Sequence, residues 1–206
     1  MITDTALLPI LLMGPMVRRA EQTGVCIQFA TSKPASCQIN LLELESYSDQ
    51  QTVALGQHLY LHFVIIKPVS TIFPLDSLLS YEFIIDGSLV DLSPWCYSSQ
   101  SAPAFVIPNK LTNILHGSCR NAHHPAKDSL VSASHLQNTQ RGNNNQGAQL
   151  LLLSGDQVYA DDVAGPMLLV IHQLIDVLGI YKEQTLALDL PDDINDQLYN
   201  RHLYLP

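Results

Sequence analysis

An apolar run that ends directly in acidic residues is the feature that most constrains the fold. Residues 148–154 read AQLLLLS, and the next eight, GDQVYADD, contain three aspartates and one tyrosine. Consecutive leucines favour a strand buried on both faces, as in a parallel sheet. Carboxylates gathered at the end of such a strand repel one another unless a positive charge lies among them. We therefore expect a cation at this point of the structure.

A second short apolar run, LTNILHGSC at residues 111–119, precedes the leucines. The segment between the two runs, about 30 residues long, includes a predicted short helix at 129–140, so the whole forms a βαβ unit with parallel strands and a right-handed crossover. In open α/β sheets, ligands bind beyond the carboxyl ends of the strands. We therefore expect Cys119 to lie beside Asp156 and Tyr159.

The preceding part of the chain has the pattern of short β-strands. Between residues 24 and 92 the runs VCIQFA, SCQINLLELE, LYLHFVII and YEFIIDGSLVDL are separated by turn residues, and Asp86-Gly87 is typical of a hairpin. The polar, proline-containing stretch at 98–109 resembles a linker. A chain of 206 residues is long enough for two small domains. The sequence predicts an α+β chain, with an antiparallel β-sandwich at 1–98 and an α/β unit at 110–206.

Residues 166–179, PMLLVIHQLIDVLG, begin with proline, end with glycine and carry apolar residues at helical spacing. These are helix signals. We interpret His172 on this helix as a packing or solvent-edge residue, since that is the commoner role of such a histidine. The tail at 183–206 is acidic and is predicted to be a partly ordered loop.

Composition excludes several classes of partner. The net charge is −9 with only ten lysines and arginines, which argues against nucleic-acid binding. No segment is apolar over the roughly 18 residues that a membrane span needs. Asp4 precedes the apolar N-terminal stretch and two arginines follow it, the reverse of a secretory signal. Four cysteines without CxxC spacing indicate reduced thiols, so we expect a cytoplasmic protein; its oligomeric state stays open.

The residue types at the two strand ends suggest a metal site. A thiolate at Cys119, a carboxylate at Asp156 and a phenolate at Tyr159 would repel one another without a cation. Oxygen donors suit iron(III), manganese, calcium or magnesium, whereas a thiolate favours iron or zinc, so the mixed set indicates iron first. The structural alternative is that Cys119 is a small buried hydrophobe, Tyr159 a packing residue and Asp156 a helix cap.

Neighbouring residues are weaker candidates. His123 and His124 follow Cys119 closely, and either could ligate a metal or contact phosphate, although loop histidines are more often only solvated. Asp161 could orient one of the metal-binding side chains without binding the metal itself, and so could Asp162. Acidic residues that precede a helix also interact favourably with its dipole, and this is the reading we favour for Asp162.

The stretches GSCR and LLLLSGDQVYADDVAGP resemble the alkaline phosphatase D family, the PhoD-like branch of the metallophosphoesterases. The resemblance implies a small β-sandwich followed by an α/β metallophosphoesterase core that hydrolyses a small phosphoester substrate. It implies that Cys119, Asp156 and Tyr159 bind an iron ion, Fe³⁺, and that Asp156 also faces a second metal such as calcium. Asp156 and Arg120 would be the catalytic residues, with Arg120 contacting a phosphate oxygen.

The chain departs from that family after Asp162. No GNH motif follows, and His202 lies in NRHLYLP, outside such a pattern. We therefore expect an incomplete core and little or no phosphoesterase activity from these 206 residues alone. Two rival interpretations remain. The chain could be an inactive interaction module with an exposed sheet edge, or an acidic calcium-binding protein using Asp156, Asp161 and Asp162, although EF-hand spacing is absent.

Overall fold

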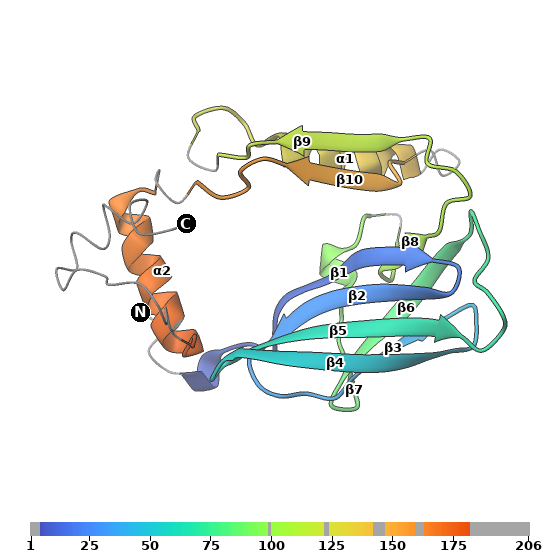
Figure 1. Cartoon of the computed structure of the whole chain (residues 1–206), viewed down its shortest axis with the longest axis horizontal. Helices are drawn as coiled ribbons and strands as arrows, with labels where there is room; N and C mark the ends of the chain where they lie inside the picture. The colour runs from blue at the N-terminus through green and yellow to red at the C-terminus, as the bar shows by residue number, and fades with distance from the viewer. Residues whose placement is uncertain (1–4, 99, 122–123, 142–146, 160–162, 182–206) are drawn as a thin grey trace, which may run out of the picture.

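The computed structural model describes residues 5–98, 100–121, 124–141, 147–159 and 163–181, and every structural statement below concerns these residues. Figure 1 shows a β-sandwich, a separate unit of two strands and a helix, and a second helix beyond one end of the sandwich. Of two short 3-10 helices, Thr5–Leu7 precedes the sandwich strands in sequence and Ser93–Trp95 lies between the last two of them.

The sandwich consists of two antiparallel sheets. The first has the order β1-β2-β5-β4, with bounds Leu11–Glu21, Gly24–Thr31, Leu59–Pro68 and Ser46–Gly56 respectively. The second pairs β6 (Leu78–Ile85) with β3 (Cys37–Leu41), β7 (Ser88–Leu89) and β8 (Ala104–Val106). The antiparallel, β-rich character predicted for the N-terminal part is therefore confirmed.

The core lies between these sheets because alternate residues of the central strands point inward. Val25, Ile27 and Phe29 of β2 are fully buried, as are Val64 and Ile66 of β5. The Phe29 ring meets the edge of the Phe83 ring from β6, with their centroids 4.6 Å apart. Such aromatic contact between two sheets adds to the free energy gained from burial.

The hairpin predicted at Asp86-Gly87 is confirmed. Ile85 pairs with Ser88, and the two turn residues have φ values of 50° and 78°. Positive φ at both central positions matches the right-handed twist of the flanking strands, which is why Asp-Gly is favoured there.

Three strands were not predicted. β4 is an edge strand whose side chains are largely exposed, so its sequence SYSDQQTVALG lacks apolar alternation. β1 is also an edge strand, and irregularities in its pairing with β2 interrupt the alternation of apolar and polar residues along it. β8 lies inside the stretch interpreted as a linker, yet Phe105 and the adjacent Ile107 are buried in the sandwich core. Residues 104–107 therefore pack as part of the sandwich rather than as a spacer.

A βαβ unit follows the sandwich. It comprises β9 (Ile114–Ser118), α1 (Ser129–Arg141) and β10 (Leu150–Ser154). β9 and β10 pair in parallel, in a register that runs from Ile114↔Leu150 to Ser118↔Ser154. The predicted helix and the predicted parallel pairing are both confirmed.

The expectation that the leucines of β10 are buried is wrong. Leu150, Leu151, Leu152 and Leu153 are 40%, 51%, 50% and 41% exposed. Within the described part of the chain, β9 is the only strand that pairs with β10, so one edge of β10 stays unpaired. A two-stranded sheet has too few neighbours to bury an apolar strand on both faces.

The predicted C-terminal helix is confirmed as α2 (Gly165–Leu178), which ends at Gly179 in the left-handed conformation. Its C-terminal end joins the tip of the β4–β5 hairpin through backbone hydrogen bonds, from Gln57 N to Gly179 O at 3.0 Å and from His58 N to Leu178 O at 2.8 Å. Leu178 is the buried residue of the helix. Among the described residues, no helix combines the length and apolar character needed to cross a membrane. The predicted tail at 183–206 lies outside the described residues.

Candidate functional site

The candidate site lies where β9 and β10 end. The strands finish in register at Ser118 and Ser154, and the Cys119 N–H then donates a hydrogen bond to the Ser154 carbonyl at 3.1 Å. Cys119 adopts a φ of 56°, an uncommon value for a residue other than glycine. The turn places its side chain against the loop that follows β10.

Gly155 makes this close approach possible. A Cβ atom built on Gly155 would lie 2.6 Å from the Cys119 Sγ and 2.8 Å from the Ser118 Oγ, and the φ of Gly155 is 66°. Both the spacing and the positive φ exclude a larger residue without a local shift. The glycine that opens GDQVY therefore allows the loop to pass directly over the thiol.

Three hydrogen bonds favour the thiolate form of Cys119. The Ser118 hydroxyl lies 3.2 Å from the Sγ. This contact, followed by hydrogen bonds from the Asp156 backbone N–H and the Tyr159 side chain, lowers the pKa of the Cys119 thiol below its ordinary value of 9.0. The negative charge of Asp156 opposes the shift, which indicates that the carboxylate is also near. The structure thus brings together the three residues predicted as metal ligands.

Arg120 faces a carboxylate in the same region. Its Nη2 lies 2.7 Å from the Asp128 Oδ2, and the Asp128 Oδ1 accepts a hydrogen bond from the Leu130 N–H at the start of α1. Asp128 therefore binds the first turn of the helix and the guanidinium together. The predicted contact between Arg120 and a phosphate oxygen stays a prediction.

A cavity of about 460 Å³ opens beside these residues. Its walls include Cys119, Tyr159 and three basic side chains, those of Arg120, His124 and Lys127. Asp156 is not among the residues that line this cavity. Asp128, the partner of Arg120, also lines this cavity, so both acidic and basic groups surround the space that a small ligand could occupy.

Other predicted residues contribute less. His124 accepts a hydrogen bond from the Ala126 N–H through its Nδ1, at 3.1 Å. His123, Asp161 and Asp162 lie outside the described residues, and so does His202. In the described ranges, no group of three or more His, Cys, Asp or Glu side chains could hold a metal ion. Cys119 and Asp156 have Tyr159 as their third donor, so the role of this trio as metal ligands stays a prediction.

Sequence reasoning did not single out Ser118, Gly155, His116 or Lys127. The His116 Nε2 lies 2.8 Å from the Ser154 Oγ, which joins the two strands through their side chains near their ends. The signal that could have identified Gly155 is its position directly after a strand and before an aspartate. A positive φ at such a position is typical of loops that approach a ligand or another backbone closely.

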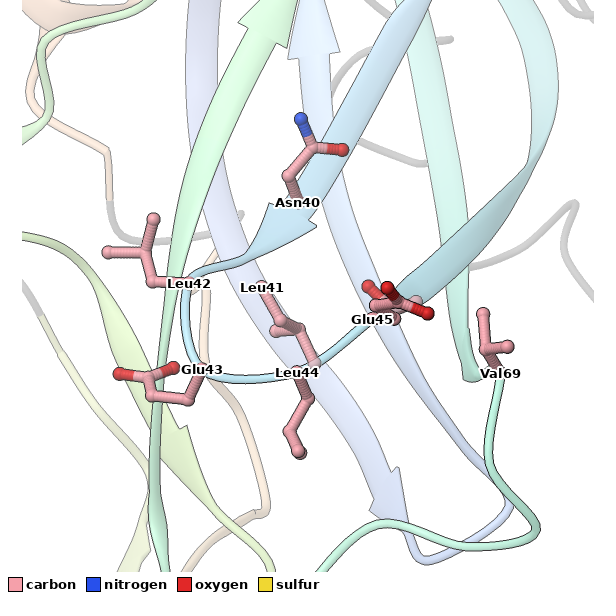
Figure 2. A pocket seen from close by; sticks show the side chains of 8 residues that line it. Asn40, Leu41, Leu42, Glu43, Leu44, Glu45 and Val69 are labelled. Carbon is pink, nitrogen blue, oxygen red and sulfur yellow. The ribbon is translucent and has the colours of Figure 1, made fainter.

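Two further hollows lie away from this site. One, of about 540 Å³, is formed by the loop from β3 to β4 and by Val69. Figure 2 shows the carboxylates of Glu43 and Glu45 at its rim together with Leu42 and Leu44. Glu43 already accepts a hydrogen bond from the Ser80 N–H at 2.9 Å, so this hollow is largely a feature of the loop between the sheets.

The other hollow, of about 1110 Å³, lies between β1 and β10 and is lined by Met16, Val17 and the four leucines of β10. It contains no cluster of chemical groups comparable with the one around Cys119. The ends of β9 and β10 therefore remain the best candidate site. Comparison of the chain with protein-family models, with curated proteins and with solved structures gives no match.

Proposed function

We propose that this chain binds an iron ion at the ends of β9 and β10 and acts in the metal-dependent hydrolysis of a small phosphoester. Cys119, Asp156 and Tyr159 would hold the iron, and Asp156 would also face a second cation such as calcium. The observation that carries the proposal is the environment of Cys119, whose thiol lies exposed at a strand end with Asp156 and Tyr159 beside it.

The donor set fits iron chemically. Metal binding requires the thiolate, and the hydrogen bonds from Ser118, Asp156 and Tyr159 increase the fraction of Cys119 in that form at neutral pH. One thiolate combined with carboxylate and phenolate oxygens favours iron over magnesium, which prefers oxygen ligands alone. The same three donors could bind another divalent metal, and the metal analysis described below would detect it.

A bound metal ion would supply Lewis-acid polarisation of a phosphoryl oxygen. The protein would supply the binding groups around it. Arg120, His124 and Lys127 line the cavity next to Cys119, where their donors could orient the phosphate of a substrate. Asp128 holds the Arg120 guanidinium at the cavity wall, which reduces the entropy lost when the arginine contacts a phosphate.

Metal retention is the deciding measurement. The chain would be purified from medium supplied with iron and calcium, and its metal content measured by mass spectrometry. We expect iron near stoichiometry in the wild type, and a tenfold to hundredfold loss of iron affinity in Cys119→Ala and Asp156→Asn. Asp176 is an exposed carboxylate on α2, so Asp176→Asn is the matched control, and this variant should keep its iron. Failure of the wild type to retain iron would overturn the proposed metal site.

Hydrolysis of bis-p-nitrophenyl phosphate and p-nitrophenyl phosphate is the second readout. Because the resembled family uses a GNH segment that this sequence lacks, we expect slow turnover that requires added iron and disappears in Asp156→Asn. Iron binding without any hydrolysis would limit the conclusion to a metal-binding protein. Calcium binding without iron would favour the calcium-binding interpretation.

An interaction module is the second candidate function, and the exposed leucines of β10 favour it. An unpaired strand edge with apolar side chains on both faces is a surface on which another polypeptide can add a strand. In that case the purified chain would contain neither iron nor activity. The variants at Cys119 and Asp156 would then behave as the wild type does.

A further inference from the structure

The hollow of about 1110 Å³ runs between two strands that belong to different sheets. Its lining includes residues 16–20 of β1 and residues 147–153, which contain the four leucines of β10. Figure 1 shows β10 on the side of its two-stranded sheet that faces β1. The sandwich and the βαβ unit therefore each supply one wall of this hollow.

Consecutive residues line the hollow on both sides. Side chains of a strand alternate between the two faces of its sheet, so a hollow over one face is lined by every second residue. All five residues 16–20 line this hollow, and so do all four leucines of β10. The hollow thus lies along the edges of β1 and β10 rather than over a face of either sheet.

Both of these edges are unpaired. Among the described residues, β1 pairs only with β2, and β10 pairs only with β9. Half of the backbone N–H and C=O groups of each strand therefore point away from the paired neighbour, with no second strand to bind them. Such an edge accepts an extended polypeptide as an additional strand.

The two edges differ in how readily they accept a strand. The pairing of β10 with β9 is regular along its whole length. The pairing of β1 shifts register between Val17 and Arg19, so Arg18 is an extra residue that bulges from the ladder. Because bulges oppose regular pairing, β10 is the edge that would bind the backbone of an added strand, and β1 would form the opposite wall.

The side chains around the hollow favour an apolar partner. The leucines of β10 are about half-exposed, and Met16 and Val17 of β1 are 39% and 41% exposed. Covering them would remove apolar surface from water, which favours association. The five residues of β1 that line the hollow span about 17 Å, so a partner strand of about the same length fits beside them.

Arg18 adds a charge to this surface. In the described ranges its guanidinium has no hydrogen bond or ion pair, whereas Arg19 binds Glu21 through two hydrogen bonds of 2.8 Å. Asp76 also lines the hollow, and its Oδ1 accepts a hydrogen bond from the Asn109 N–H at 2.9 Å. Since Asp76 repels a second carboxylate, an acidic residue of the partner has to lie at Arg18.

We propose that the hollow between β1 and β10 is a docking site for an extended, apolar segment of another protein that carries one acidic residue. The segment adds as a strand to the free edge of β10, and its acidic side chain pairs with Arg18. This inference names the surface and the partner of the interaction function considered above. It is independent of the iron site, because neither Cys119 nor Asp156 lines the hollow.

Docking would be measured on the full chain by fluorescence anisotropy. The probe is a fluorescein-labelled peptide of alternating valine and isoleucine with one central aspartate, and its partner probe has lysine in place of the aspartate. We expect saturable binding of the aspartate peptide. Cys119→Ala should bind it as the wild type does, so that loss of the iron site and loss of docking are distinguished. Absence of binding to the wild type would overturn the proposal.

Hydrogen exchange tests whether the peptide adds as a strand. Alternate amides of β10 do not bond to β9, and their exchange should slow when the aspartate peptide binds. Binding that leaves exchange in β10 unchanged would show adsorption to apolar side chains and would refute strand addition. Dimers of the chain that the peptide does not dissociate would assign the hollow to a second copy and exclude the proposed partner.

Arg18→Gln tests the charge. The wild type should prefer the aspartate peptide to the lysine peptide by about twofold to fivefold, as expected for an exposed ion pair, and Arg18→Gln should remove this preference. Lys67→Gln is the control, because it removes a positive charge on β5 that does not line the hollow. An equal preference in the wild type and in Arg18→Gln would refute the pairing with Arg18.

Discussion

Gly155 and Cys119 approach each other so closely that a Cβ atom on the glycine would lie 2.6 Å from the cysteine Sγ. The two residues follow the last paired positions of β10 and β9, and each has a positive φ, 66° for Gly155 and 56° for Cys119. This contact holds the thiol beneath the loop that carries Asp156 and Tyr159.

Gly155→Ala is therefore expected to disrupt the site. An alanine at positive φ costs about 1–2 kcal/mol, and its methyl group would in addition displace the Cys119 side chain. We expect lower stability in urea and a Cys119 thiol that reacts less readily with iodoacetamide at neutral pH. Gly165→Ala is the control, since nothing lies within 4 Å of the added methyl group and its φ is not positive. Equal stability of the two variants would contradict the predicted clash.

The thiols should react with iodoacetamide over separate pH ranges. Hydrogen bonds, first of all from Ser118, lower the pKa of Cys119, whereas burial raises the pKa of Cys37 to about 11 and also raises that of Cys96. Because the thiolate is the reactive form, Cys119 should be alkylated at a lower pH than the other two. Mass spectrometry of the labelled peptides would measure each rate.

Ser118→Ala should move the Cys119 profile to higher pH, because it removes the hydrogen bond that contributes most to the shift. Ser134→Ala on α1 changes the same side chain at an exposed position and should have no effect. Identical profiles for Ser118→Ala and the wild type would show that the hydroxyl does not stabilise the thiolate.

Gly56→Ala should separate α2 from the sandwich. A Cβ atom at Gly56 would lie 2.7 Å from the Leu178 carbonyl oxygen and 2.8 Å from that of Gly179, and backbone atoms cannot rotate away as a side chain can. We expect hydrogen exchange at Gln57 and His58 to accelerate at least tenfold, since these amides bond to the end of the helix.

The sandwich itself should tolerate that change, because the three atoms nearest to the added methyl group all belong to Leu178 and Gly179 at the end of α2. Gly24→Ala provides the comparison: its Cβ would lie 3.4 Å from the Ile66 carbonyl oxygen, close to ordinary contact. Unaltered protection at Gln57 and His58 in Gly56→Ala would show that the helix end can adjust.

The leucines of β10 should make the chain associate with itself. An exposed apolar strand with an unpaired edge pairs readily with another strand, and a charge on it opposes this. We expect Leu151→Glu to reduce association in size-exclusion chromatography with light scattering. Leu169→Glu adds the same charge to exposed α2 and should reduce association less. Equal effects would indicate that net charge, rather than β10, governs association.

The sequence predicted those parts of the fold that depend on local pattern. Val25, Ile27 and Phe29 alternate with polar or smaller residues, and this period identifies a strand with one face in the core. Asp86-Gly87 identified its hairpin through the φ values that it tolerates. β4 was missed because an exposed edge strand has no apolar period to detect. β8 was missed because a strand of three residues in a segment bounded by prolines resembles a loop.

The sequence predicted that Cys119, Asp156 and Tyr159 lie near one another, but it predicted neither the local geometry of the candidate site nor its other residues. The order of the elements predicts a parallel pair of strands. Because the two strands end at the same level, Cys119 lies beside the loop that carries Asp156. The support from Ser118 and the contact with Gly155 depend on the turn after each strand, which the sequence does not specify. The burial of β10 was predicted wrongly because four consecutive leucines show only that the strand is apolar. They do not show how many neighbouring strands are present to cover it.

The parallel pairing of β9 with β10 has a consequence for how the chain folds. β4 and β5 join through a tight hairpin, so their first contacts close a very short loop, whereas Ile114 and Leu150 meet only after the whole α1 crossover has been traversed. Closing the longer loop costs more entropy before any pairing compensates for it. We therefore expect the β4–β5 hairpin to fold early and the Cys119 pocket to assemble late, so that slow refolding phases report on the pocket.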